Sequence, residues 1–222
     1  TIIASTSSTM LPEELAGFSV RPNHFLNAHF LNPAYLIPLV EVSPGDATDV
    51  AVQDRLMALD LPPEDAEALR QNFAGDIQTR VTHLDGWAAM GTHLPPKEKR
   101  GLVLVDPPFE EKGEFNRMAQ SLEKAHKRWP GGIYAFWYPI KEPAEVEAYV
   151  KALKKTGIPK TLQLELTIRP PSTPPRLHGT GMVVVNPPFV LEEEMRTLLP
   201  VLANLLSDEG RGQWRINWVA GE

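Results

Sequence analysis

The sequence predicts a doubly wound α/β sheet with an antiparallel element at its C-terminal edge. From about residue 52 to the C-terminus, strand-like apolar segments alternate with amphipathic helical segments, and proline or glycine punctuates the turns between them. The chain has 222 residues, of which 42% are hydrophobic and 23% are charged, which is the composition of an ordinary globular protein. We therefore expect one folded domain over residues 52–222.

The strands are predicted from short apolar or alternating segments that end at a turn. The clearest is the uninterrupted run Gly-Leu-Val-Leu-Val at residues 101–105, which is typical of a strand buried on both faces of a parallel sheet. The other predicted strands cover residues 52–60, 80–85, 133–138, 161–168, 182–185 and 215–220. The last of these closes the sheet as its antiparallel edge.

The helices are predicted from apolar residues that recur every three or four positions. Residues 63–73, 112–129 and 191–206 show this period, and residue 198 is among those expected to face inward in the last helix. A further helix begins near Pro143, because a missing amide is tolerated in the first turn, and ends before Gly157.

Residues 1–51 do not share this pattern. They begin with a Ser/Thr-rich stretch, and prolines are scattered between positions 21 and 45 among apolar residues that have no period. No strand followed by a glycine-rich turn is recognisable there. We interpret residues 1–51 as an irregular segment, divergent or truncated, in which the first strand of the sheet is missing or replaced.

Composition excludes several kinds of site. The chain has no cysteine, so neither a disulfide framework nor a thiolate metal site is possible, and this composition fits the cytoplasm. His24 and His29 lie five positions apart on an unassigned segment, which more often indicates packing or surface histidines than ligands. We expect no metal site, and no apolar stretch is long enough to indicate a membrane span.

The formal net charge of −6 argues mildly against a protein whose whole surface binds phosphate. Basic residues nevertheless occur in three groups, which we interpret first as solvated helix faces and helix C-termini. The groups are Lys97, Lys99 and Arg100; Lys124, Lys127 and Arg128; and Lys151, Lys154, Lys155 and Lys160.

Acidic residues end three successive predicted strands. In open α/β sheets, ligands bind beyond the carboxyl ends of the strands, where Asp60, Asp85 and Asp106 are expected. An acid there can hold ribose hydroxyls, and an acid followed by glycine, such as Asp85-Gly86, can accept a hydrogen bond from an adenine amino group. Each acid alone more often caps a helix. Three in succession favour a site for a nucleoside cofactor.

The most informative motif is Asp106-Pro107-Pro108-Phe109, directly after the apolar strand. Consecutive prolines fix φ and remove two amide donors, so the nearby carbonyls can accept other hydrogen bonds. Together with the Asp106 carboxylate they could bind both hydrogens of an exocyclic amino group, which leaves the nitrogen lone pair free for in-line attack on a methyl-sulfonium carbon. Phe109 offers a stacking face for the base. The alternative is a rigid turn that only ends a strand.

A second box, Asn186-Pro187-Pro188-Phe189, also follows a predicted buried strand. Asparagine could make the same hydrogen bonds, so spacing alone does not decide which box is active. We favour Asp106, because its strand follows those that end in Asp60 and Asp85, and interpret the Asn186 box mainly as a structural turn.

Three segments in this order resemble the RlmJ family of 23S rRNA adenine-N6 methyltransferases: residues 100–109, 131–139 and 179–189. The similarity extends from about residue 52 to the C-terminus. It implies a Rossmann-like methyltransferase sheet, S-adenosyl-L-methionine (SAM) as methyl donor, and 23S rRNA, protein-free or in an early precursor, as the partner of a cytoplasmic monomer.

The resemblance also implies roles for single residues. Asp106 would contact the target amino group and the cofactor, and Asp85-Gly86 would contact the cofactor's adenine. Asp60 stands where the family usually has glutamate, and Phe109 stands where tyrosine is commoner. The family's His-rich start, its lysine and its Asp-Thr-His-Ala-Gly-like turn have no counterpart in residues 1–51.

Three functions remain open at this point. The first is methylation of adenosine N6 in rRNA, and the second is a catalytically impaired relative that binds RNA or a protein. The third is a DNA adenine-N6 methyltransferase. If the first strand and its turn are absent, we expect SAM to bind hardly better than adenosine and methyl transfer to be undetectable, because nothing would hold the methionine end.

Overall fold

A computed structural model of the chain describes residues 3–5, 25–30, 40–44, 57–58, 67, 70–71, 74–75, 80–82, 84–96, 101–107, 109, 112–207 and 210–221. The chain divides into two compact units, Thr1–Ala89 and Met90–Glu222. Each unit is described by itself below.

The first unit contains two small sheets. Strands β1 (Ile3–Ser5) and β2 (Phe25–Phe30) pair in parallel, and β3 (Val40–Pro44) pairs antiparallel with β2. The described parts of residues 1–51, a segment that shows no sequence period, therefore form three short strands. Strands as short as these can be too brief to produce a recognisable period among scattered prolines.

The predicted strands at 52–60 and 80–85 correspond to the two-residue strands β4 (Met57–Ala58) and β5 (Arg80–Val81), which pair in parallel. The sequence did not predict α3 (Gly86–Thr92), which lies at the boundary between the units. In the predicted helix at 63–73, the three described residues 67, 70 and 71 are helical.

The second unit is built on a five-stranded sheet in the order β10-β8-β9-β7-β6. The strands are β6 (Leu102–Val105), β7 (Ile133–Ile140), β8 (Thr161–Thr167), β9 (Gly179–Val185) and β10 (Gln213–Ala220). β6 and β7 are parallel, β9 is antiparallel to both β7 and β8, and β10 is antiparallel to β8. The predicted antiparallel C-terminal edge is confirmed, and β9 adds an antiparallel strand inside the sheet.

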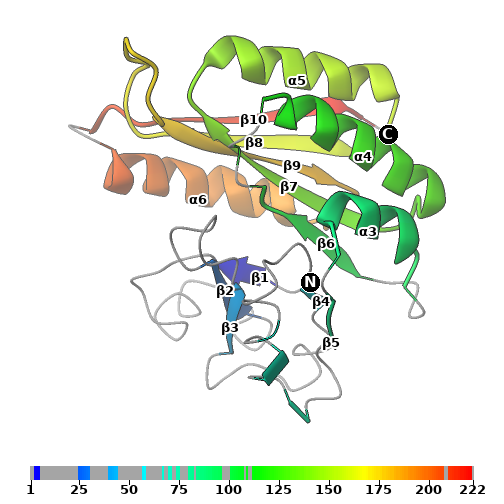
Figure 1. Cartoon of the computed structure of the whole chain (residues 1–222). Helices are drawn as coiled ribbons and strands as arrows, with labels where there is room; N and C mark the ends of the chain where they lie inside the picture. The colour runs from blue at the N-terminus through cyan, green and yellow to red at the C-terminus, as the bar shows by residue number, and fades with distance from the viewer. Residues whose placement is uncertain are drawn as a thin grey trace. The chain divides into compact units, whose positions relative to one another are not determined.

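Helices cover both faces of this sheet, as a doubly wound fold requires (Figure 1). α4 (Glu114–Arg128) and α5 (Pro143–Thr156) lie on one face, and α6 (Leu191–Leu206) lies on the other. Pro143 occupies the first turn of α5, and Gly157 ends that helix with a φ of 68°. Both residues play the roles that their positions in the sequence predict.

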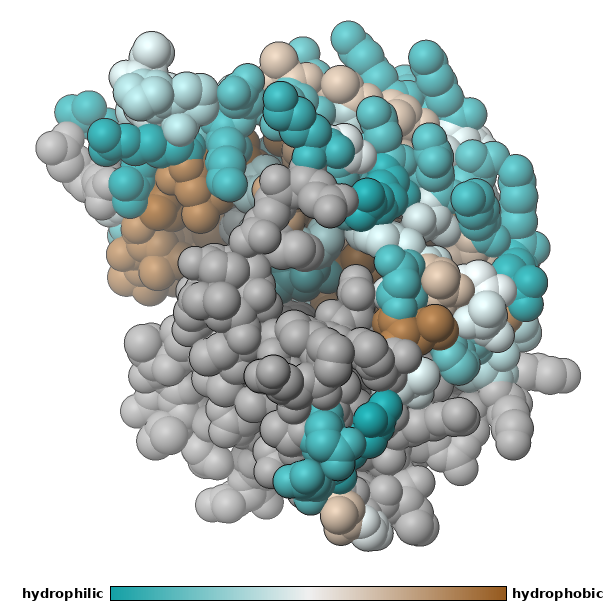
Figure 2. Space-filling view, in the orientation of Figure 1, coloured by the Kyte–Doolittle hydropathy of each residue, from teal (hydrophilic) through white to brown (hydrophobic). Residues whose placement is uncertain are grey.

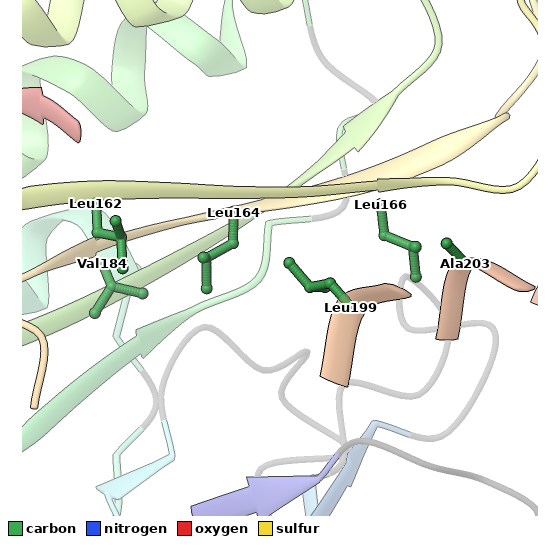
Figure 3. Packing of buried hydrophobic residues seen from close by; sticks show 6 residues of the cluster. All are labelled: Leu162, Leu164, Leu166, Val184, Leu199 and Ala203. Atoms are coloured by element: carbon green, nitrogen blue, oxygen red, sulfur yellow. The ribbon is translucent and has the colours of Figure 1, made fainter. Parts of the chain in front are cut away.

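Alternate residues of β8 form the core beneath α6. Leu162, Leu164 and Leu166 point from the strand toward Leu199 and Ala203 of the helix (Figure 3). These side chains are buried, and each fully buried leucine contributes roughly 1.5–3 kcal/mol through removal of apolar area from water. The alternating apolar residues of β8 and the helically spaced apolar residues of α6 thus meet in one shared core.

The opposite face of β8 is polar and lies under α5. The Tyr138 hydroxyl donates a hydrogen bond to Glu165 Oε1 at 3.0 Å, and Gln163 Nε2 donates to the same oxygen at 2.8 Å. The Tyr138 ring packs edge to face on Tyr149 of α5, with 5.5 Å between the ring centroids. Gly181 of β9 lies opposite Tyr138, and a Cβ there would overlap the tyrosine ring.

The prediction that residues 101–105 form a strand buried on both faces is wrong. Leu102 is 55% exposed and Leu104 is 37% exposed. Their pairing partners show that Val103 and Val105 share the face covered by α4, whereas Leu102 and Leu104 lie on the α6 face. α6 packs against β8 and β10, so it leaves the β6 end of that face uncovered within the described second unit.

α6 also has a second apolar stripe that faces away from the sheet. Leu198, Val201 and Leu205 recur at helical spacing and are exposed, so the expected inward position of Leu198 is wrong. Figure 2 shows an apolar patch over this helix, whereas hydrophilic side chains gather over α4 and α5. The sequence period identifies the helix, but a helix with two apolar stripes does not indicate which one faces the sheet.

Gly181→Ala should destabilise the second unit by about 1–3 kcal/mol, because the new methyl group would overlap the buried Tyr138 ring inside the sheet. Gly131→Ala is the matched control, since a Cβ at Gly131 meets no atom within 4 Å. Urea unfolding followed by tryptophan fluorescence measures both variants. Equal stability of the two would show that the sheet can separate enough to accept the methyl group.

Candidate active site

The direction of the strands brings one group of loops together. β6, β7 and β8 run the same way, so their carboxyl ends lie at one edge of the five-stranded sheet, which we call the carboxyl edge. Asp106, Lys141 and Arg169 follow these three strands directly or within two residues. Antiparallel β9 and β10 begin at the same edge. This is the edge at which open α/β sheets bind ligands.

Asp106 is held in a poorly solvated position at this edge. Burial raises the pKa of its carboxyl from 3.8 to about 6, because the charged form is desolvated. Pro107 is buried and offers no backbone N–H to compensate the charge. Pro108 lies outside the described residues. The result is an acceptor group that would gain from a ligand carrying N–H donors.

Phe109 has an unusual backbone conformation. Its φ is 54°, a left-handed value that costs a side-chain-bearing residue on the order of 1 kcal/mol and that concentrates at functional sites. The ring contacts Phe115 of α4 and Trp137 of β7, with centroid distances of 4.9 and 6.1 Å, both edge to face. These contacts fix the half-buried ring beside Asp106.

A pocket of about 350 Å³ adjoins this ring. Its apolar walls include Phe109, Phe115 and Pro139. Two lysines, Lys112 and Lys141, and two glutamates, Glu114 and Glu145, also line it. Asp106 does not line this pocket.

Asp85 acts as the N-cap of α3. Its Oδ1 accepts a hydrogen bond from the backbone N–H of Ala88 at 2.7 Å, and its carbonyl accepts one from Ala89 at 2.9 Å. The structure thus shows the capping role that was the alternative for this residue. Asp85 is exposed, and contact of Asp85 or Gly86 with a cofactor stays a prediction. Asp60 lies outside the described residues.

The second Pro-Pro-Phe box lies at the opposite edge of the sheet from Asp106, because β9 is antiparallel to β7. Asn186 Nδ2 donates hydrogen bonds to the carbonyls of Pro130 and Gly132, both at 2.8 Å. Its backbone N–H donates to the carbonyl of Lys160. The asparagine therefore ties three turns together, and Phe189 is 99% exposed. This geometry supports its interpretation as a structural turn.

Three arginines at the carboxyl edge were missed in the sequence. Arg169, Arg211 and Arg215 line one pocket, although 46 positions separate the first from the last in the chain. They belong to no basic run and no helix, so no periodic signal marks them. Only the pairing of β10 with β8 brings them together.

Among the described residues, no group of three or more His, Asp or Glu side chains could hold a metal ion. No helix in the described part of the chain is both long and apolar enough to cross a membrane.

We expect Asp106→Asn to raise the free energy of unfolding at pH 7.5 by up to about 3 kcal/mol, the cost of shifting a carboxyl pKa from 3.8 to about 6. Because the folded pKa lies above the unfolded value, the native carboxylate is destabilising above pH 6, and this penalty disappears as the pH falls through 6 toward 4. The stability difference between variant and wild type should therefore vanish near pH 4. Urea unfolding across this range measures it, and a difference independent of pH would contradict the burial of this charge.

Comparisons with known proteins divide the chain. The family model for ribosomal RNA large subunit methyltransferase D, RlmJ, matches residues 39–220. Residues 1–60 match the NAD-binding domain of 3-hydroxyacyl-CoA dehydrogenase. Over 48 residues, or 22% of the chain, there is 48% identity to 7% of the fatty acid oxidation complex subunit alpha of Acinetobacter baumannii. The two family matches overlap at residues 39–60, so the RlmJ match begins earlier than residue 52, where the sequence suggested that it starts.

Relatives over the rest of the chain are methyltransferases by name. The ribosomal RNA large subunit methyltransferase J of Haemophilus influenzae is 41% identical over 170 residues, which cover 77% of this chain and 60% of the relative. The Escherichia coli protein of the same name is 37% identical over 170 residues, covering 77% and 61%. The chain thus spans about 60% of the length of these relatives.

A crystal structure of a Legionella pneumophila protein of the DUF519 family has a similar fold. The TM-score is 0.64 at 25% identity, over 74% of this chain and 61% of the other. The mixed five-stranded sheet, the acid and proline at the end of β6 and the match over residues 39–220 agree with one another. The chain therefore belongs to the RlmJ family of ribosomal RNA large subunit methyltransferases.

Proposed function

We propose that this chain transfers a methyl group from SAM to N6 of an adenosine in 23S rRNA, with the target amino group bound at Asp106. One observation carries the proposal: a desolvated carboxylate, with a pKa of about 6, is followed by an amide-free proline at the carboxyl edge of the sheet in a member of this family. The names of the Haemophilus and Escherichia relatives support rRNA as the substrate class.

The residues at Asp106 fit an amino group. A carboxylate deprived of water gains most from a ligand that donates N–H hydrogen bonds, and Pro107 leaves local acceptors unoccupied by its own amide. By accepting both hydrogens, Asp106 and the neighbouring carbonyls would turn the nitrogen lone pair outward. SAM, when bound, would supply a methyl group on a positively charged sulfur. Holding the nitrogen in line with it would provide much of the rate.

Phe109 would stack on the target base. Its ring is already fixed by Phe115 and Trp137, so little side-chain freedom is lost on binding. Asp60, Asp85 and Gly86 are the residues that we propose for the adenosine part of the cofactor. We propose further that the protein acts as a monomer in the cytoplasm, on protein-free 23S rRNA or an early precursor.

A second candidate is an RNA-binding relative without transfer activity. It is favoured by the match of residues 1–60 to a dehydrogenase domain, whereas the RlmJ match begins at residue 39. The two candidates differ in how the methionine end of SAM is bound. They can therefore be separated by affinity as well as by turnover.

Asp106→Ala should reduce methyl transfer to protein-free 23S rRNA by at least about a hundredfold, because an electrostatic contact used in the transition state is removed. Tritium transfer from labelled SAM measures this. Asn186→Ala is the matched control: it should lower stability by about 1–3 kcal/mol through loss of two hydrogen bonds, yet retain transfer at temperatures where it is folded. A larger loss of transfer in the Asn186 variant would reverse the assignment.

SAM should bind at least about tenfold more tightly than adenosine if the chain is an active methyltransferase, and calorimetry measures both. Asp85→Ala should weaken the binding of SAM and of adenosine equally, by on the order of 1–3 kcal/mol, because Asp85 is proposed to contact the adenosine part that both share.

Asp85→Ser separates this role from helix capping, since serine also caps a helix but has no carboxylate. It should weaken both ligands as alanine does. Equal affinities of the wild type for SAM and adenosine, without turnover, would favour the second candidate.

A further inference from the structure

We propose that the pocket lined by Arg169, Arg211 and Arg215 binds backbone phosphates of a single RNA strand next to the target adenosine. We call it the arginine pocket. This inference rests on the proposed function in that it takes RNA as the ligand and Asp106 as the position of the target base. It adds a second substrate-binding site to the one proposed at Asp106.

The arginine pocket is large and combines an apolar floor with a charged rim. Its volume is about 720 Å³, and it lies between the first turns of α5 and the sheet, with Ile140 and Val146 among its apolar walls. The arginines come from the end of β8 and the beginning of β10. Guanidinium groups bind phosphate and carboxylate oxygens through two parallel N–H donors, so an arginine cluster suits the phosphates of a nucleic-acid strand.

Three arginines and two carboxylates line this pocket. Of its two carboxylates, Glu165 is buried, and its oxygens are engaged by Tyr138, Gln163 and Arg215. The Arg215 Nε lies 3.5 Å from Glu165 Oε2, while 68% of the arginine side chain is exposed. The buried Glu165 carboxylate thus holds the Arg215 side chain at Nε, while most of the surface of that arginine side chain stays exposed. Glu147 is the remaining acidic residue.

The arginine pocket lies on the same edge of the sheet as Asp106. The pocket beside Phe109 is lined by Pro139 and Lys141, and the arginine pocket by the intervening Ile140. The two cavities are therefore neighbours along the end of β7. A strand whose base lies at Asp106 and Phe109 could place its adjoining phosphates at Lys141 and then at the arginines.

The loop that begins at Arg169 is stiff and fastened at its base. Four of residues 170–175 are proline, and the loop projects beyond the sheet between β8 and β9 (Figure 1). The backbone N–H of Ile168 donates to the carbonyl of His178 at 2.8 Å, and that of His178 donates to Ile140 at 3.0 Å. A fixed loop lowers the conformational entropy lost when a phosphate binds.

The test measures binding of a short fluorescein-labelled single-stranded oligoribonucleotide to the full chain by anisotropy, over a series of KCl concentrations. The variant is the double substitution Arg169→Gln and Arg211→Gln, which leaves the Arg215–Glu165 pair intact. The matched control is Lys154→Gln with Lys155→Gln, which removes the same charge from the C-terminus of α5, away from the carboxyl edge. Thermal unfolding establishes that both doubles are folded.

We expect the arginine double to raise Kd about tenfold and to reduce the slope of log K against log salt by about 1.4, since each phosphate contact to a single strand contributes about 0.7. The lysine double should change neither. Equal effects of the two doubles, or no salt-dependent binding by the wild type, would overturn the inference.

Asp106→Ala, measured both for methyl transfer and for binding of the oligoribonucleotide, separates a failure of this inference from a failure of the proposed function. It should lose methyl transfer while keeping the wild-type slope of log K against log salt, because the Asp106 carboxylate is proposed to contact a base and no phosphate. If Asp106→Ala retained transfer and the arginine double still lost affinity, the proposed catalytic role would fall and the arginine pocket would stand. If only Asp106→Ala behaved as expected, the arginine pocket alone would fall.

Discussion

The common direction of β6, β7 and β8 is the constraint on which the candidate site depends. Parallel strands place their carboxyl ends at one edge, and this gathers Asp106, Lys141 and Arg169 from segments far apart in the chain. The antiparallel β9 between β7 and β8 has the opposite effect. It sends the residue that follows it, Asn186, to the other edge of the same sheet.

The two Pro-Pro-Phe boxes show that one local sequence pattern can have two different surroundings. The side-chain amide of Asn186 donates hydrogen bonds to the carbonyls of Pro130 and Gly132, so it stabilises the fold. Asp106 instead carries a carboxyl whose pKa is raised to about 6 by desolvation, a shift that opposes folding at neutral pH. A group that opposes folding and lies at a ligand-binding edge indicates function, whereas a group with all its bonds made indicates structure.

The sequence predicted much of the second unit because its elements are long and periodic. The segments that became β7, α5, β8, α6 and β10 were each identified with their turns. Burial of β6 was not predictable, because an apolar run reveals hydrophobicity but not which neighbours cover it. The same holds for Asp85, where only the distance to the Ala88 amide distinguishes a cap from a cofactor ligand. The cluster of three arginines could not be predicted, because no sequence period links them and only the pairing of β10 with β8 brings them together.

Local charge matters more for RNA contact than the net charge of −6. At about 0.15 M salt, exposed charges more than about 8 Å apart are largely screened, so a phosphate at the carboxyl edge interacts mainly with the groups that line that edge. Those groups include Lys112, Lys141 and three arginines, and on the acidic side Glu114, Glu145, Glu147 and the buried, hydrogen-bonded Glu165. The lysine-rich ends of α4 and α5 lie at the opposite edge, because helices that connect parallel strands run back against them. Lysine runs are the basic feature easiest to see in the sequence, yet the strand direction places them away from Asp106. The contact with an RNA strand that we propose there therefore involves the scattered arginines.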